Sequence, residues 1–482
     1  AWGEVGIITL TPHIDDSDYL GAGDLGSGDG SVLTPSGNVG RFTPDHFVLT
    51  AATTTQRSDA AGCYAGTGAT HGDIAVANNV LTVADAVGLA AGDAVVVLGA
   101  GSGGGDLVTT VSAVAGTAIT LASNASTTVT AAPVFKRLGF SYLGEPLALA
   151  LDLEARNSDD AVTANYTTAG GFAKLSEASP LGGGADSWGL WGVVNNLYGV
   201  AGCRALFADS GSYDTSYEGT ACSGVAAAAP WAPTAPYAAS APRVAVANTT
   251  AVTWAAGLTT LATDVMLRRA SVVDGPFDFT RGSFVLGAWP KDADGVTLAT
   301  AARNLDTDTT AGADRVAVGV ADLRFGRLRL QNAYGSELLA LPLPMTVESF
   351  AGAGGWQRES GDSCTPVEVP ASAIGCTADS CDWTDLLLNL PQRAMTLTAV
   401  SPAPVLAHPT TGNTHVPARG DFGLRLTAPG AGRQGSLRVT ATAPAYLKYR
   451  WTAAGTLDSD DPWALATFGT RRSQFIFMRE GY

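Results

Sequence analysis

Short runs in which apolar and polar residues alternate recur along most of the chain. One example is Leu147-Ala148-Leu149-Ala150-Leu151, which lies between Gly144-Glu145-Pro146 and the polar stretch Arg156–Asp160. Alternation with a period of two, bounded by turn-forming residues, is typical of short β-strands. The pattern therefore predicts an all-β protein built from several Ig-like β-sandwich units.

The clearest strand signal is the stretch Leu323–Leu338. Its apolar positions alternate, but the period slips by one residue at Gly326, as at a β-bulge. After the slip, Arg327 and Arg329 share the face opposite the leucines. Two neighbouring cations need compensation, so we expect both to meet Asp or Glu side chains on an adjacent strand.

The overlapping segment Arg324–Leu339, RFGRLRLQNAYGSELL, resembles the RxGRLRLxNAYGSELL signature of MshQ-like proteins. These proteins are encoded with mannose-sensitive-haemagglutinin (MSHA) type IV pilus systems and carry a large C-terminal domain of unknown function. Further matching motifs occur in the same order at Val5–Pro12, Asp18–Gly23, Gly37–Phe47, Phe140–Gly144, Ala155–Asn157, Asn165–Tyr166, Phe172–Leu175, Asp362–Cys364, Ala466–Gly469 and Phe477–Tyr482. The stretches 65–135 and 180–240 do not match and look like insertions. The resemblance implies a protein of the bacterial cell surface.

The motifs and turn signals divide the chain into six segments. These are an Ig-like sandwich from 1–62 and 136–180, an inserted small β module at 65–135, an insertion rich in Gly, Ala, Pro and aromatic residues at 181–242, a sandwich with the arginine-rich strand at 243–360, a cysteine-rich connector at 361–384, and a C-terminal β domain at 385–482. Apolar residues between Asp186 and Phe207 have roughly helical spacing, which predicts at most a short helix there.

Composition agrees with an extracellular location. The 482 residues carry a formal charge of −16, which argues against nucleic acid as a partner. No apolar run is long enough to span a bilayer as a helix. The six cysteines are even in number and lack a CxxC pair, so disulfides fit better than a zinc site. The expected pairs are Cys376 with Cys381, Cys203 with Cys222 and, by elimination, Cys63 with Cys364.

Catalytic motifs are incomplete. Gly361-Asp362-Ser363 and Leu49–Ala52 are similar to pieces of serine proteases, but Thr53 stands where the histidine base would be. We therefore expect no catalytic residues and no organic cofactor.

Calcium is the one ion that the residue types suit. Asp292 and Asp294 open a DxDG loop, and Asp458 and Asp460 form another acidic group. The alternative is that these are ordinary turn aspartates.

Three aromatic residues of the 181–242 insertion, Trp188, Trp191 and Tyr198, suit a glycan-binding surface, because flat rings pack on sugar faces. Packing of the insertion onto its host domain is the alternative. If the insertion carries binding, deleting 182–240 should leave a folded protein that no longer adheres.

Together these features predict a non-catalytic, extracellular protein that acts in adhesion or pilus assembly, with pilus or filament subunits as partners and a surface glycan or a host or abiotic surface as target. One alternative is a structural subunit that forms homo-oligomeric filaments through edge strands such as Ile7–Leu10 or Phe475–Met478. Another is a glycan-binding module or an unrecognised hydrolase.

Overall fold

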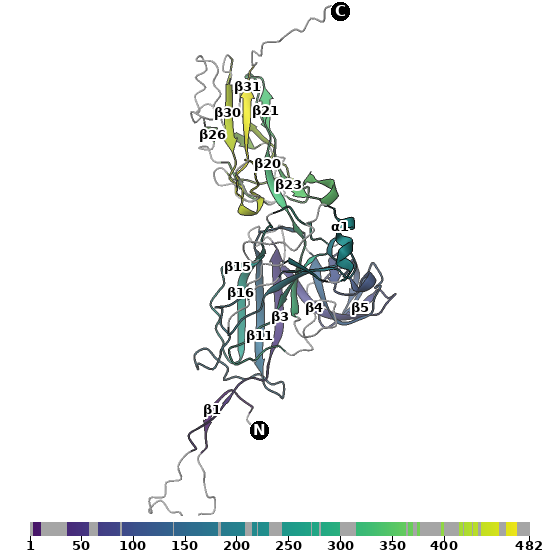
Figure 1. Ribbon diagram of the computed structural model, residues 1–482, viewed down its shortest axis with the longest axis vertical. Coiled ribbons are helices and arrows are strands. Elements are labelled where there is room, and N and C mark those ends of the chain that lie inside the picture. Colours follow the sequence, from purple (N-terminus) through teal and green to yellow (C-terminus); the bar gives the residue numbers. More distant parts are fainter. Residues whose placement is uncertain are drawn as a thin grey trace, which may run out of the picture.

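The computed structural model in Figure 1 has two β domains stacked end to end, with a smaller β module at the side of the first. The structure describes residues 3–10, 36–56, 66–86, 89–137, 139–181, 185–207, 215–218, 220–230, 243–270, 272–278, 281–298, 315–362, 365–369, 374–375, 397–399, 414–417, 419–426, 428–431, 435–452 and 459–469. The predicted all-β class is confirmed.

The first sheet of the sandwich domain follows from the alternating runs. Its strands lie in the order β15 (Val244–Ala247), β16 (Leu258–Leu267), β11 (Leu147–Arg156) and β3 (His46–Gln56). In β11, buried and half-buried positions alternate along the whole strand. Its leucines face the core while the intervening residues face outward, which preserves the period of two.

The second sheet of the sandwich is buried on both faces. Its strands lie in the order β14 (Thr215–Glu218), β13 (Arg204–Phe207), β12 (Trp191–Asn195), β17 (Phe284–Ala288) and β18 (Val316–Ala321). Every residue of β13 and β17 is buried. A strand covered on both sides carries an apolar run without alternation, and periodicity cannot distinguish such a run from a buried helix.

This sheet corrects two sequence-based predictions and specifies a third. The segment 181–242 is not a separate insertion, because it supplies β12, β13 and β14. The segment 243–360 is not a separate domain, because β15 to β18 complete the sandwich begun by β3 and β11. Between Asp186 and Phe207 the expectation of at most a short helix agrees with the structure, in which the 3-10 helix η2 (Leu197–Gly199) joins two strands.

The inserted β module is a closed barrel. Its strands run β4 (Gly66–Ile74), β5 (Val80–Val83), β8 (Ala118–Leu121), β7 (Leu107–Ala115), β6 (Ala94–Val97) and β9 (Val129–Arg137), and β9 pairs back with β4. Closure removes free strand edges. The interior is filled by small and branched apolar side chains that form a core of their own.

The barrel packs on the outer face of the second sheet through β6. Val95 and Val97 point into the barrel, whereas Val96 belongs to a second cluster with Val193 and Val285 of the sandwich. Alternation along one strand thus divides its side chains between two cores, which fixes the barrel against the sandwich.

The C-terminal domain begins at Gly326 and surrounds one core. One sheet has three strands, β20 (Gly326–Leu330), β23 (Met345–Phe350) and β24 (Trp356–Arg358), and another has four, β21 (Ala333–Gly335), β31 (Trp463–Phe468), β30 (Gly435–Thr440) and β26 (Ile374–Gly375). A further sheet consists of β22 (Leu341–Leu343), β29 (Leu424–Leu426) and β27 (Leu397–Ala399). The short strands β25 (Val367–Glu368) and β28 (Thr414–His415) pair with each other. The expected boundary at 361–384 is therefore wrong, because β25 and β26 from that stretch pair within this domain.

The period slip at Gly326 marks the domain junction and not a bulge within one strand. β19 (Leu323–Arg324) pairs in parallel with β10 (Ser141–Tyr142), whereas β20 pairs with β23. Phe325 packs in the sandwich core and Leu328 in the C-terminal core. The signature stretch therefore connects the two cores.

The remaining elements are short. β1 (Gly6–Thr9) and β2 (Asn38–Phe42) form a two-stranded ribbon at the far end of the sandwich (Figure 1). Helical pieces are α1 (Val225–Ala228), η1 (Ser102–Gly104), η3 (Thr220–Gly224), η5 (Gly352–Gly354) and η8 (Ala445–Leu447). Within the described ranges, no helix has the length and apolar character needed to cross a membrane.

Candidate functional sites

The aromatic residues predicted to bind a glycan are mostly core residues. Trp188 is fully buried, with its indole Nε1 donating to the Ser176 carbonyl oxygen at 2.7 Å, and Tyr198 is buried in the same core. Trp191 is half-buried, and the guanidinium of Arg315 lies 4.3 Å from its ring centroid. Two of the three rings are therefore buried and the third carries a guanidinium on its ring, so the three do not form the predicted aromatic platform. The packing alternative holds for Trp188 and Tyr198, which lie in the sandwich core beside β12 and not on its surface.

The predicted calcium ligands are engaged by protein donors. Asp292 is fully buried; its Oδ1 accepts from the backbone N–H groups of Asp294 and Val296, and its Oδ2 accepts from the Tyr166 hydroxyl at 2.7 Å. Asp294 pairs with Arg41 at 2.5 Å. Burial raises the pKa of the Asp292 carboxyl. Asp292 closes a turn of the fold, and these contacts favour the turn-aspartate alternative over a calcium ligand.

The second acidic group also serves local structure. Oδ2 of Asp460 accepts from the backbone N–H groups of Trp451 and Thr452 and from the Thr452 hydroxyl. The Ser459 hydroxyl donates to Oδ1 of Asp460, and this bond together with those from Thr452 and Trp451 lowers the pKa of the carboxyl. Asp458 lies outside the described residues.

Cys203 and Cys222, the pair expected in the 181–242 stretch, form a disulfide. It joins the start of β13 to the turn η3. Cys63, Cys364, Cys376 and Cys381 lie outside the described residues.

Glu348 is the acidic residue that compensates the two arginines of the arginine-rich strand. Arg327 and Arg329 of β20 both bond to its carboxylate from the neighbouring strand β23, at 2.6 and 3.0 Å. The prediction of a facing acidic residue is confirmed, and the arginines contribute to the fold of the C-terminal domain.

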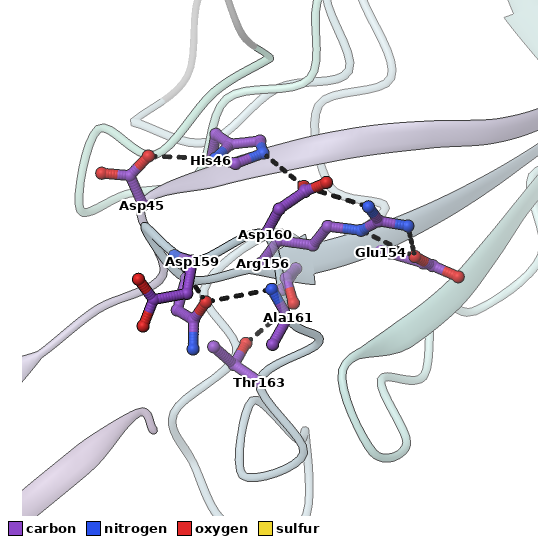
Figure 2. A network of polar contacts seen from close by, with 10 residues as sticks. Asp45, His46, Glu154, Arg156, Asp159, Asp160, Ala161 and Thr163 are labelled. Atoms are coloured by element: carbon purple, nitrogen blue, oxygen red, sulfur yellow. Dashed lines mark hydrogen bonds and ion pairs between the residues drawn. The ribbon is translucent and has the colours of Figure 1, made fainter. Parts of the chain in front are cut away.

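Motif residues that are far apart in the sequence meet at the free end of the sandwich (Figure 2). β3 begins at His46 and β11 ends at Arg156, so the antiparallel pairing brings the two residues opposite each other. The His46 ring contacts Asp45 at 3.0 Å and Asp160 at 3.4 Å, while Arg156 contacts Glu154 at 2.6 Å and Asp160 at 3.0 Å. The Arg156 guanidinium lowers the pKa of Asp160.

A cavity of about 360 Å³ beside this network is lined by Glu4, Arg41, Asp45 and Asn157, among others. Several of its polar groups already have partners. Asn157 donates to the Gly3 carbonyl oxygen and accepts from the N–H groups of Asp159 and Ala161, and Glu4 accepts from the N–H groups of Ala164 and Asn165. The network therefore closes the end of the sandwich.

A second cavity differs in this respect. It has a volume of about 290 Å³ and lies between the barrel turn that carries Ser102 and Asp106 and the part of the sandwich formed by the end of β12 at Asn195, the following Asn196, and Ser283. Asn195 is 2% exposed, and neither atom of its carboxamide has a hydrogen-bond partner among the residues that the structure describes. The sequence offered one signal for this site: the polar pair Asn195-Asn196 interrupts an otherwise apolar run.

Comparison with known proteins adds a family. A model of the third domain of DUF6701 matches residues 4–70 and 119–197, and a model of its fourth domain matches residues 324–481. The unmatched stretch between 70 and 119 falls within the barrel, and the second match starts at the domain junction.

No curated protein matches the chain. Among solved structures, the crystal structure of a tetra-tandem repeat in the extending region of a large adhesion protein matches with 12% sequence identity, covering 88% of this chain and 92% of that chain, at a TM-score of 0.16. We draw no conclusion from that low score. From the two domain models, which together match more than half of the residues, the chain belongs to the DUF6701 family and carries its third and fourth domains.

Proposed function

We propose that this chain is a non-catalytic protein of the bacterial cell exterior that acts in adhesion or in the assembly of a surface appendage such as an MSHA-type pilus. The observation that carries the proposal is the interlocked junction between its two domains. Phe140 and Tyr142 lie just before the sandwich strand β11 in the sequence, yet they pack in the core of the C-terminal domain. An extended surface protein needs such a connection to hold successive domains in line under load.

Polar contacts reinforce the junction. The Tyr142 hydroxyl donates to Asp362 at 2.8 Å, and Arg324 pairs with the buried Glu359 at 2.7 Å. The Arg269 guanidinium donates to the carbonyl oxygens of Lys448 at 2.5 Å and Gly326 at 3.1 Å. Domain interfaces inside one chain are loose by default, and buried polar pairs across this one favour a fixed orientation.

Two further features support the exterior location. The Cys203–Cys222 disulfide fits an oxidising compartment. The resemblance of the signature stretch to MshQ-like proteins supports the association with a pilus.

The absence of catalysis is part of the proposal. In the polar network of Figure 2, both ring nitrogens of His46 face carboxylates, so the imidazole is not positioned to activate a hydroxyl or thiol nucleophile. Asp106 and Asn195 of the second cavity have no histidine or cysteine among the residues that line it. We likewise propose that the protein works without a cofactor.

The test is surface labelling and attachment in the source bacterium. Antibody against this chain should label intact cells, and in-frame deletion should reduce attachment or pilus number. Complementation with Arg269→Ala, which weakens the junction, should restore less attachment under flow than the wild type, whereas Asp152→Asn on β11 should restore it fully. Labelling that requires permeabilised cells would contradict the proposed location.

A second candidate is a structural subunit that polymerises through the β1–β2 ribbon. Ile7 is 46% exposed and Leu10 is 55% exposed, which leaves apolar side chains open on a ribbon with free edges. Concentration-dependent filaments of the purified chain in electron microscopy, abolished by Ile7→Lys, would favour this candidate over the first.

A further inference from the structure

The β1–β2 ribbon at the free end of the sandwich has open strand edges. Within the described ranges it forms a sheet of two strands, and neither outer edge pairs with a third strand. Ile7 is 46% exposed and Leu10 is 55% exposed. An extended segment of another chain can add to such an edge as a further strand, with main-chain hydrogen bonds and contacts between alternate side chains. The ribbon therefore offers both backbone pairing and apolar contact to a partner.

Negative charge surrounds the base of the ribbon. The two arginines at this end, Arg41 and Arg156, already form ion pairs with carboxylates. Asp45 and Asp160 remain largely open to solvent, with side-chain exposures of 60% and 67%. The sequence that joins β1 to β2, residues 11–35, contains five aspartates and no lysine or arginine. This end of the molecule therefore favours a partner that carries positive charge.

A cavity at the base of the ribbon is open to a cationic side chain. It is the cavity of about 360 Å³ that Glu4 and Asp45 line. Oδ2 of Asp45 contacts the His46 ring, and no described group bonds to its Oδ1. An exposed carboxylate of this kind accepts strong, charge-assisted hydrogen bonds from a guanidinium. An arginine beside an added strand would therefore find an acceptor here.

The chain itself contains a segment of matching composition. Residues 470–479, which lie outside the described residues, have the sequence TRRSQFIFMR. The segment has three arginines and no aspartate or glutamate, and the apolar run Phe475–Met478 lies between two of the arginines. It follows Gly469, whose N–H donates to the Gly335 carbonyl oxygen at the end of β21. Aromatic and β-branched residues favour the extended conformation that strand addition requires.

The segment is too far from the ribbon of its own copy to reach it. β31 ends in the C-terminal domain, at the end of the molecule opposite to the ribbon (Figure 1). From Gly469 to Phe475 an extended chain covers at most about 22 Å. β11 alone, which runs from the domain junction to the ribbon end, has 10 residues and spans about 33 Å. A second copy is therefore needed to bring this segment to the ribbon.

We propose that the ribbon end of one copy binds residues 470–479 of a second copy as an added β-strand. Phe475–Met478 pack against Ile7 and Leu10, and the flanking arginines meet the carboxylates at the base of the ribbon. The two surfaces lie at opposite ends of the molecule, so the contact is heterologous and repeats into a linear filament. This inference deepens the second candidate function by naming the segment that the ribbon binds, and it rests on that candidate.

Peptide binding tests the acceptor surface. A fluorescently labelled synthetic peptide of residues 470–479 should bind the purified chain in an anisotropy titration, and added salt should weaken the binding. Ile7→Lys removes an apolar contact and adds a charge of the same sign as the peptide, so it should weaken peptide binding at least about tenfold. Val80→Lys is the matched control, because Val80 is 40% exposed on β5 of the barrel, and this variant should bind as the wild type does.

Analytical ultracentrifugation of the purified chain tests the assembly. The wild type should associate as its concentration rises, whereas Ile7→Lys and the double variant Arg471→Glu/Arg472→Glu should each stay monomeric. A mixture of the two variants contains one intact ribbon and one intact C-terminal segment. The mixture should therefore form a dimer and no larger species.

The inference is overturned if the peptide does not bind, if it binds Ile7→Lys as well as the wild type, or if the mixture stays monomeric. Association that is lost in Ile7→Lys but kept in the double variant would mean that ribbons pair with each other. That result overturns this inference and leaves the second candidate standing. A chain that never associates refutes both, while surface labelling and attachment of cells still decide the first proposed function.

Discussion

Arg327 and Glu348 lie directly opposite each other on β20 and β23, and the arginine Nε and Nη2 both donate to the same glutamate oxygen, at 2.8 and 2.6 Å. The guanidinium also lies 3.9 Å from the centroid of the Trp356 ring. Side-chain exposure is 13% for the arginine and 9% for the glutamate, so the pair is shielded from solvent. The Arg327–Glu348 pair should therefore contribute more to stability than a solvent-exposed ion pair does.

Arg327→Ala should lower the free energy of unfolding by about 2–3 kcal/mol, because it leaves a largely buried carboxylate with one cation and removes packing on Trp356. Arg329→Ala is the matched control; its side chain is 41% exposed, and we expect a loss below about 1 kcal/mol. Urea unfolding measures both. If Arg327→Ala left stability unchanged but abolished attachment, Arg327 would be a binding residue.

Gly326→Ala should destabilise the domain junction by roughly 1–3 kcal/mol, the usual cost of overpacking. A Cβ at this position would lie 2.4 Å from the Tyr142 ring and 2.6 Å from Leu447. Gly224→Ala is a suitable control, since its backbone is helical and its new Cβ would lie 3.6 Å from Val200. Equal melting temperatures for the two variants would mean that the junction yields easily.

Asp106→Asn should stabilise the protein in a pH-dependent way. The folded-state pKa of about 6 exceeds the ordinary value of 3.8, so the folded state binds more protons between these values and loses stability as pH rises through 6. The amide removes this penalty. Because the side chain is partly exposed, we expect a gain of about 1–2 kcal/mol near pH 8 and almost none near pH 3.

Thermal unfolding of wild type and variant at both pH values measures this difference, with Asp152→Asn as the control for loss of a negative charge elsewhere. A gain of the same size at both pH values would show that burial of the Asp106 charge is not its cause.

Replacing Cys203 and Cys222 together by alanine should cost about 3 kcal/mol, the value expected for closing a loop of 19 residues. Peptide mapping of the unreduced wild type should recover the two cysteines in one linked fragment. Free thiols at both positions would contradict the structure directly.

Deleting residues 182–240 should unfold the sandwich, contrary to the expectation from sequence that the deletion is tolerated. The deletion removes β12, β13 and β14 and exposes Val285 and Phe284 of β17. Circular dichroism and proteolysis measure the loss. The same Gly/Ser linker placed at the exposed hairpin turn of Gly116 should leave the fold intact.

The sequence by itself determined the β class, the strands covered on one face and the charge compensation of the arginine-rich strand. Each depends on local alternation, as in β11, where one buried face imposes a period of two. The pairing of Cys203 with Cys222 was also accessible, because both cysteines lie in one short stretch.

Only the tertiary structure decided which segments share a core. β12 and β17 are buried on both faces, so their sequences lack the alternation that would have identified them as strands of the sandwich. The one-residue slip in alternation at Gly326 suggested a bulge. The same slip arises where the chain leaves the core of one domain and enters the core of the next, so the sequence pattern does not distinguish the two cases. The cavity between the barrel and the sandwich exists only when the two are docked, and no local pattern places residues as distant in sequence as Asp106 and Ser283 beside one cavity.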